Sequence, residues 1–210
     1  MAETKPALKV SVFSDYICPF CYIGSRRLLR LRDAYDLQVN WCALEIHPET
    51  PAQGMPVTGL GYPPAQWQRM MSALQDMARA EQLDLQAHDF TTNSHRALLL
   101  AEAAKEAGRK VFYALHERLF DAFFREGRNI GEPQVLRALA AECLVPEPLI
   151  EAAWSQPRYE QRLALNRRHA AELGVGGTPT YVFGTRILVG AVAGEELRRA
   201  ARATASDPIR

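Results

Sequence analysis

The chain has 210 residues, with 25 Lys and Arg against 24 Asp and Glu, so its formal net charge is only +1. This balance excludes the strongly basic surface typical of nucleic-acid binding, and 48% hydrophobic with 23% charged residues excludes a disordered chain. The length predicts one large domain or a domain that carries an insertion.

The first sixty residues predict a β-α-β unit. Residues 8–14 alternate around Val10 and Val12, which indicates a short buried strand. Over residues 19–35 the apolar side chains recur at helical spacing and four arginines occupy other positions, which predicts an amphipathic helix. Residues 37–46 have the pattern of a second strand. Because a helix connects the two strands, we expect them to be parallel.

The composition changes after the second predicted strand. Residues 47–64 contain five prolines and three glycines, which predicts a long loop, and a loop of this length often borders a functional site. From there to residue 173 nearly everything is helical in pattern. The predicted helices cover residues 65–81, 94–107, 110–124, 133–143, 147–154 and 158–173.

The end of the chain returns to strand patterns. Residues 180–183 and 186–189 are two short β-branched runs around Gly184, which predicts a hairpin, and residues 194–203 predict a closing helix. The order β-α-β, helices, β-β-α predicts an α/β fold in which one domain is interrupted by an all-helical insertion.

No stretch reaches the roughly 18 apolar residues of a membrane span, and the N-terminal residues lack the apolar core of a signal peptide. We therefore expect a cytoplasmic protein without membrane attachment. Disulfides are rarely structural in that compartment, so any disulfide chemistry of the four cysteines is expected to be catalytic or redox-sensing.

The segment Cys18-Pro19-Phe20-Cys21 lies where the first strand meets the first helix. Pro19 suits the first helical position, which makes Cys18 the N-cap residue and places Cys21 one turn into the helix. Unpaired amides and the helix dipole favour negative charge there, so we expect Cys18 to be an exposed thiolate. Such settings lower a cysteine pKa from about 8.5 to roughly 3.5–7.5. Cys21 is placed to attack the sulfur of Cys18, as a resolving thiol would.

Half of a zinc site is the structural alternative for this pair. It needs two further ligands, and Cys42, Cys143 and the five histidines are isolated in the sequence. We therefore expect no metal site. Cys42, on a strand, and Cys143, at a helix end, are interpreted as small buried hydrophobic residues.

A second motif, Gly-Thr-Pro at residues 177–179, precedes the third strand. Taken alone, it predicts a trans proline that ends a glycine-rich loop. Together with Phe13-Ser14-Asp15, the Cys-Pro-Phe-Cys-Tyr-Ile-Gly run and Gly190-Ala191, however, it resembles the DsbA-like thioredoxin superfamily. The resemblance covers essentially the whole chain and is strongest to the cytosolic FrnE-type branch, whose usual motif has Trp where this chain has Phe20.

The resemblance implies a thioredoxin fold, with residues 1–63 and 156–210 as the thioredoxin-like domain and residues 64–155 as a helical insertion. It implies that Thr178-Pro179 is a cis-proline turn facing the cysteines, and that Pro19, Phe20, Thr178 and Pro179 bind substrate. The implied function is a thiol-disulfide oxidoreductase, acting as a disulfide reductase or isomerase, with Cys18 and Cys21 as catalytic residues. Implied partners are disulfide-containing proteins or small thiols such as glutathione, a candidate co-substrate, with no other cofactor and with a monomer or homodimer as the assembly.

One departure concerns proton transfer. Thioredoxin proper has a buried acid six residues before its first cysteine, where this chain has Val12. Proton transfer at Cys21 would then depend on water or on another acid, for which Glu45 is the candidate.

Two other functions remain open. Glutathione-dependent isomerases and transferases, of the 2-hydroxychromene-2-carboxylate isomerase or kappa type, share the inserted thioredoxin fold but carry serine or another residue in place of the nucleophile. Retention of Cys18 and Cys21 argues against that class. The third function is a non-catalytic module that holds peptides in the groove around Pro179.

Overall fold

The structure of the chain, a computed structural model, describes residues 5–86 and 89–205. Its main sheet has four strands in the order β2-β1-β5-β6. The strands are β1 (Ala7–Ser14), β2 (Asp36–Ala43), β5 (Thr180–Phe183) and β6 (Arg186–Val189). The β1–β2 pair is parallel and the β1–β5 and β5–β6 pairs are antiparallel, which confirms the predicted parallel pair and the predicted hairpin.

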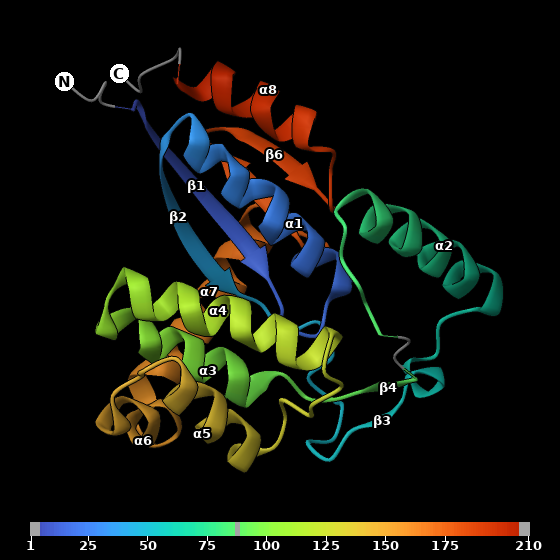
Figure 1. The fold of residues 1–210 in the computed structure, drawn as a ribbon, viewed down its shortest axis with the longest axis vertical. Coiled ribbons are helices and arrows are strands. Elements are labelled where there is room, and N and C mark those ends of the chain that lie inside the picture. Colours follow the sequence, from blue (N-terminus) through green and yellow to red (C-terminus); the bar gives the residue numbers. More distant parts are fainter. Residues whose placement is uncertain (1–4, 87–88, 206–210) are drawn as a thin grey trace.

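Helices α1 (Pro19–Leu29) and α8 (Gly194–Ala205) cover one face of this sheet (Figure 1). Leu8, Val10 and Val12 of β1 are buried on that face and belong to one core cluster with Leu28 of α1 and Leu197 of α8. They alternate along β1 with more exposed residues, as a strand with one buried face requires. The predicted α/β architecture is therefore confirmed.

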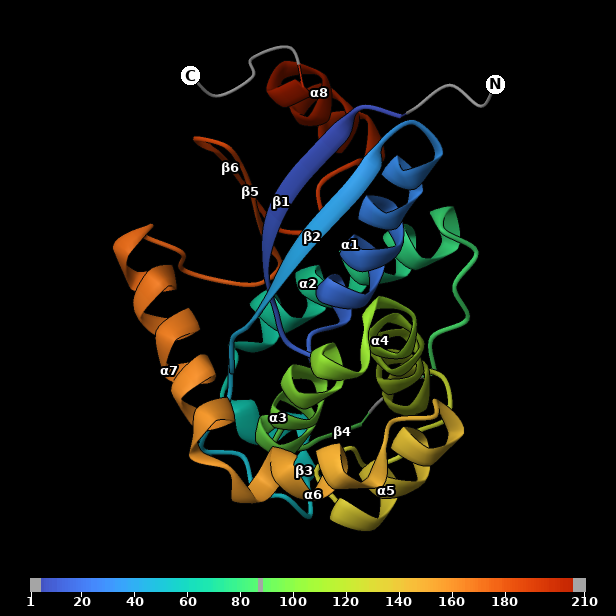
Figure 2. The same ribbon diagram turned by 90° about the vertical axis from the view of Figure 1, so that its left-hand side faces the viewer.

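The remaining helices lie between β2 and β5 in the sequence. Figure 2 shows that α3 to α6 gather at one end of the sheet, while α7 stands on the side opposite α1. The core cluster runs continuously from the sheet into α3 and α4. Within the part of the chain that the structure describes, no helix is long and apolar enough to span a bilayer. The helices are α2 (Pro64–Ala80), α3 (His95–Ala104), α4 (Arg109–Phe124), α5 (Pro133–Glu142), α6 (Glu147–Ser155) and α7 (Pro157–Glu172).

Helix α2, which the predicted boundaries assign to the insertion, packs against α1. Ala78 of α2 forms a small buried cluster with Ile23 of α1 and with Ala191, which follows β6. This contact brings the start of the predicted insertion beside the helix that begins at Cys18. The domain boundaries themselves stay a prediction.

Several element ends differ from the predicted ones. The first helix ends at Leu29 and continues as the 3-10 turn η1 (Arg30–Asp33), because helix ends often tighten in this way. Strand β2 ends at Ala43 rather than at residue 46, since the amide of Ile46 donates to the Asp15 carboxylate instead of to a neighbouring strand. The helix predicted over residues 94–107 likewise ends as a 3-10 turn, η3 (Lys105–Ala107). The elements missing from the prediction are very short: β3 (Met55–Pro56), η2 (Val57–Leu60) and β4 (Phe90–Thr91).

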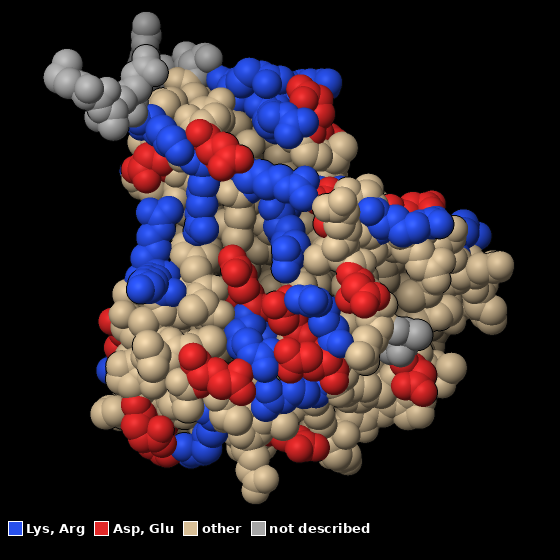
Figure 3. Space-filling model, viewed as in Figure 1, with Lys and Arg blue, Asp and Glu red and all other residues tan. Residues whose placement is uncertain are grey.

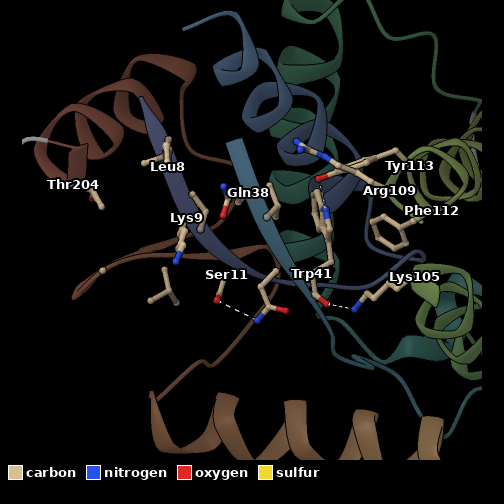
Figure 4. A pocket seen from close by; sticks show the side chains of 16 residues that line it. Leu8, Lys9, Ser11, Gln38, Trp41, Lys105, Arg109, Phe112, Tyr113 and Thr204 are labelled. Carbon is tan, nitrogen blue, oxygen red and sulfur yellow. Dashed lines mark hydrogen bonds between the residues drawn. The ribbon is translucent and has the colours of Figure 1, made fainter. Parts of the chain in front are cut away.

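Strand β2 is an edge of the sheet, and side chains cover several of its outward-facing carbonyls. Lys105 donates to the carbonyl of Trp41 over 2.6 Å, Arg109 to that of Leu37 over 2.6 Å, and Asn166 to that of Ala43 over 3.3 Å. Figure 4 shows Lys105 reaching Trp41. Because open edge strands invite pairing with other chains, these contacts protect β2.

Candidate active site

The cysteine pair lies at the N-terminus of α1, as the sequence predicts. Cys18 is the N-cap residue in an extended conformation, with φ −91° and ψ 112°, and Pro19 begins the helix. The amide of Cys21 donates to the carbonyl of Cys18 over 3.0 Å, which closes the first turn. Both cysteines are free thiols. The turn therefore holds two reduced sulfurs on one helix end.

The structure corrects the expectation that Cys18 is exposed, because only 4% of its surface is accessible. The turn before β5 packs on it, and the Cys18 thiol donates to the carbonyl oxygen of Thr178 over 3.5 Å. Pro19 and Phe20 remain half-buried beside it, and Phe20 packs against the cluster where α1 meets α2. Cys18 is therefore largely covered, and Pro19 and Phe20 are the partly exposed residues that follow it in the chain.

The Thr178–Pro179 turn is fixed next to the pair. Its peptide bond is cis. The carbonyl of Pro179 accepts from the amide of Gly190 over 2.8 Å, and the Thr180 hydroxyl donates to the carbonyl of Gly177 over 2.7 Å. The structure thus brings Thr178 and Pro179, some 160 residues away in the sequence, to the two cysteines.

The two thiols have opposite electrostatic environments. A hydrogen bond from the Cys21 thiol, with smaller contributions from the Thr178 side chain and the Cys21 amide, lowers the pKa of Cys18, although burial and the charge of Asp15 oppose this. Burial, together with the hydrogen bond to Cys18, raises the pKa of Cys21 well above its ordinary value. The pair is thus arranged so that Cys18 ionises before Cys21.

Three arginines of α1 and of the η1 turn that follows it are engaged elsewhere. Arg27 and Arg30 both pair with Glu81, at 2.8 and 2.6 Å, and Arg26 lies 3.8 Å from Asp121. On the face that carries α1, acidic side chains adjoin the basic ones (Figure 3). The lowered pKa of Cys18 is explained by its local hydrogen bonds.

Asp15 is a buried acid whose role sequence reasoning missed. It is 1% exposed and lies three residues before Cys18. Its carboxylate accepts from the amides of Ile17 and Ile46, over 3.3 and 2.9 Å. Burial nevertheless raises its pKa to about 6. The available signal was an acidic residue between a buried strand and the Cys-Pro-Phe-Cys turn.

Glu45, the predicted candidate acid, has another function in the structure. Its buried carboxylate lies 3.1 Å from Nδ1 of His95 and 3.3 Å from the Arg167 guanidinium. These ion pairs connect the segment after β2 to α3 and α7. The acid whose charge acts on Cys18 is Asp15.

The loop over residues 47–64 borders the site, as its length suggests. Burial, with smaller contributions from the charges of Cys18 and Glu49, raises the pKa of Tyr62. The Tyr62 hydroxyl lies 3.2 Å from Nε2 of His47, and its ring stacks on Trp67 with centroids 6.0 Å apart. This loop therefore lies close enough to Cys18 for the charge of that cysteine to act on Tyr62, and Tyr62 in turn contacts α2 through Trp67.

The other two cysteines are separate from the pair. Cys42 is buried in a small cluster with Phe13 and Ala170, and burial raises its pKa to about 11. Burial also raises the pKa of the half-buried Cys143. Across residues 5–86 and 89–205, no group of three or more His, Cys, Asp or Glu side chains could hold a metal ion.

A cleft of about 900 Å³ lies away from this chemistry, along the sheet and the edge strand β2 (Figure 4). Its walls include Lys9, Trp41, Arg109 and Tyr113, and its lining contains neither cysteine of the pair. The cysteine turn, with its perturbed thiols, is the candidate active site.

The different thiol environments predict a clear order of alkylation. At neutral pH, iodoacetamide is expected to modify Cys18 before Cys143, although Cys143 is the more exposed sulfur, because only the thiolate reacts. Peptide mass mapping over a time course measures this order. Modification of Cys143 first would contradict the proposed thiolate at Cys18.

Comparisons with known proteins support the same fold. The model of the DsbA-like thioredoxin domain matches residues 9–202. A probable DsbA oxidoreductase from Streptomyces coelicolor is similar over 97% of this chain and 92% of its own, with a TM-score of 0.84 and 24% identity. A 2-hydroxychromene-2-carboxylate isomerase is similar over 95% of both chains, with a TM-score of 0.74 and 19% identity. The cytosolic disulfide reductase DsbM from Pseudomonas aeruginosa, solved with GSH, covers 95% of this chain and 96% of its own, with a TM-score of 0.67 and 23% identity. At these identities, the structural likenesses show a shared fold alone.

Proposed function

Because the chain belongs to the DsbA-like thioredoxin family, we propose that it is a thiol-disulfide oxidoreductase that uses Cys18 and Cys21. The observation that carries this proposal is the asymmetry of the pair. Cys18 has a lowered pKa at the helix N-terminus, while its neighbour Cys21 has a raised one. A nucleophile that ionises first and a second thiol within its reach are what disulfide exchange requires.

In the reducing direction, the Cys18 thiolate attacks one sulfur of a substrate disulfide. A bond forms between Cys18 and that sulfur, and the other substrate sulfur leaves as a thiolate. Cys21 then loses its proton and attacks Cys18, which releases the first substrate sulfur and leaves an oxidised Cys18–Cys21 pair. Two electrons pass from the pair to the substrate. The reverse sequence oxidises a dithiol.

We propose that Pro19, Phe20, Thr178 and Pro179 bind the substrate. Pro19 and Phe20 are half-buried at the rim, and the Thr178 carbonyl lies 3.5 Å from the Cys18 sulfur. An extended substrate backbone alongside Thr178 would hold its disulfide beside Cys18.

The proposed partners are disulfide-containing proteins and small thiols, with glutathione as co-substrate, and the proposed setting is the cytoplasm. DsbM, which shares the fold, is a cytosolic reductase that was solved with GSH. In a reducing compartment, mass action would favour the dithiol form, so reduction or isomerisation is the proposed direction. No further cofactor is needed for these steps.

A glutathione-dependent isomerase or transferase is the alternative function, and the isomerase fold match is compatible with it. Such a reaction needs a glutathione site but no resolving thiol. The buried Cys21 and its hydrogen bond to Cys18 are explained by disulfide exchange and are not required by the alternative.

Reduction of insulin by dithiothreitol tests the proposal. The wild-type protein is expected to accelerate it, and Cys18→Ala is expected to give no acceleration. Cys143→Ala is the matched control, since it removes a cysteine outside the pair and should keep full acceleration. Equal rates with wild type and Cys18→Ala would contradict the proposal. Glutathione-dependent turnover that survives Cys21→Ala would favour the alternative.

A further inference from the structure

Beneath the first turns of α1 lies a buried tyrosine hydroxyl without a hydrogen bond. Tyr181 is 0% exposed, and its Oη has no partner among the residues that the structure describes. Burying a hydroxyl without a partner costs stability, so phenylalanine would suit an apolar core better at this position. The presence of a hydroxyl at this position is therefore better explained by a functional role than by fold stability.

The sheet directs this hydroxyl towards the helix that carries the cysteines. Tyr181 of β5 is directly paired with Val12 of β1, so the two side chains share a face of the sheet. Tyr181, Val12 and Cys21 belong to the same core cluster. Val12 is apolar, and Tyr181 is the residue of this cross-strand pair that carries a polar atom into the core under α1.

Gly24 locates the hydroxyl more closely. A Cβ atom at Gly24 would lie only 2.0 Å from Oη of Tyr181. Gly24 follows Cys21 by three residues, which places the two on the same side of α1. The absence of a side chain at Gly24 therefore leaves room for the hydroxyl against the turn that presents Cys21.

The charges that reach Tyr181 agree with this placement. After burial, the charge of Cys21 is the largest cause that raises the pKa of Tyr181, and Cys18 contributes less. Arg27 acts in the opposite direction, but it is ion-paired with Glu81 at 2.8 Å. Cys21 is thus the ionisable group to which the hydroxyl is most strongly coupled.

We propose that Tyr181 is a positioning residue for the resolving step, whose hydroxyl donates a hydrogen bond to the Cys21 sulfur as that sulfur becomes a thiolate. The inference rests on the proposed disulfide exchange. In this step the Cys21–Cys18 bond forms and the bond between Cys18 and the substrate sulfur breaks. The electron pair of the broken bond leaves with the substrate sulfur, which takes up the proton that Cys21 has lost. Tyr181 keeps its own proton.

The resolving step needs such a donor because Cys21 is hard to ionise. Burial holds the pKa of Cys21 well above its ordinary value. Once Cys18 is bound to substrate, its sulfur no longer carries the negative charge that accepted the hydrogen bond from the Cys21 thiol. The Tyr181 hydroxyl, which has no partner among the described residues in the dithiol state, can then donate to the new thiolate at Cys21. The hydrogen bond formed in this step offsets the free-energy cost of burying the hydroxyl.

The first test measures the Cys21 pKa without requiring activity. In a Cys18→Ala background, Tyr181→Phe is expected to raise the pKa of Cys21 by about one unit or more, the effect of losing a hydrogen bond to a charged group. Ultraviolet absorbance of the thiolate against pH gives this value. Tyr159→Phe is the matched control, since that buried tyrosine donates to Glu106 over 3.0 Å in a different part of the molecule, and no change at Cys21 is expected.

The second test follows resolution in the otherwise wild-type protein. Tyr181→Phe is expected to slow release of substrate from a preformed Cys18 mixed disulfide by roughly tenfold to a hundredfold. The rate at which Cys18 is alkylated and the stability towards urea should not decrease. If the hydroxyl had only a structural role, slower resolution would be accompanied by lower stability. Equal Cys21 pKa values and equal resolution rates would overturn the inference. Failure of the proposed function would give a different result: the wild-type protein would show no disulfide turnover, whatever the effect of Tyr181→Phe on the Cys21 pKa.

Discussion

Replacing Cys21 by serine is expected to stop turnover of a disulfide substrate and to leave that substrate bound covalently to Cys18. Serine keeps the size and the hydrogen-bond donor of the position, so Cys18 retains a partner that stabilises its thiolate. Its hydroxyl cannot attack a disulfide. Release then depends on an external thiol, whereas well-oriented intramolecular reactions reach effective concentrations of about 10⁵ M or more. The steady-state rate should fall by orders of magnitude.

The trapped species is measured by intact mass and by non-reducing gel electrophoresis after exposure to oxidised glutathione or insulin. The adduct should map to Cys18 and should be absent from Cys18→Ala. Cys21→Ala provides a graded comparison, since it also removes the donor that lowers the pKa of Cys18 and should form the adduct more slowly. An adduct that maps to Cys143, or rapid release from Cys21→Ser, would exclude the proposed division of roles.

The features of the site that could be predicted are those set by neighbouring residues. Pro19 at the start of a helix assigns the N-cap to Cys18 through local rules alone, and the structure has this geometry. The β-branched runs around Gly184 likewise indicate a hairpin, and Gly184 adopts the φ of 58° that such a turn needs.

The features that could not be predicted depend on contacts between distant segments. Burial of Cys18 comes from the Thr178 turn, and the buried hydroxyl of Tyr181 follows from the pairing of β5 with β1. Glu45 was the predicted acid and Asp15 was overlooked, because both lie at strand ends, where no periodicity fixes the direction of a side chain. Only the packed structure shows that the charge of Asp15 acts on Cys18, whereas Glu45 pairs with His95.

His116 is expected to be the residue outside the cysteine pair whose loss costs most stability. It is 1% exposed on α4. Its Nδ1 lies 3.0 Å from the Tyr16 hydroxyl and its Nε2 lies 2.9 Å from the Ser25 hydroxyl, so one ring connects the insertion to the segment before Cys18 and to α1. Trp41 packs on the ring with centroids 4.2 Å apart.

His116→Ala leaves two buried hydroxyls without their partner and a cavity among aromatic rings. Together these effects are expected to lower the free energy of unfolding by about 3–5 kcal/mol, a large share of the roughly 5–15 kcal/mol available to a typical domain. Urea unfolding of the wild type and the variant at neutral pH measures the difference. A loss below about 1 kcal/mol would show that the contacts of His116 are replaceable.

The same histidine is expected to make the fold acid-sensitive. Burial, aided by Lys105 and Arg32, lowers the pKa of His116 to about 3 from an ordinary 6.5. Between pH 6.5 and 3 the unfolded chain therefore binds a proton at His116 that the folded chain does not bind. The contribution of the neutral, buried His116 to stability is complete above pH 6.5 and is lost as the pH falls towards 3. A shift of that size corresponds to roughly 5 kcal/mol.

His95 supplies a control of opposite sign, because its hydrogen bond to Glu45 raises its pKa to about 9 and its contribution to stability is lost as the pH rises. His116→Ala should flatten the acid limb of the urea-unfolding profile and His95→Ala should not. Because Tyr16 and Ser25 flank the cysteine turn, acid that charges His116 is expected to loosen the support of Cys18 along with the fold.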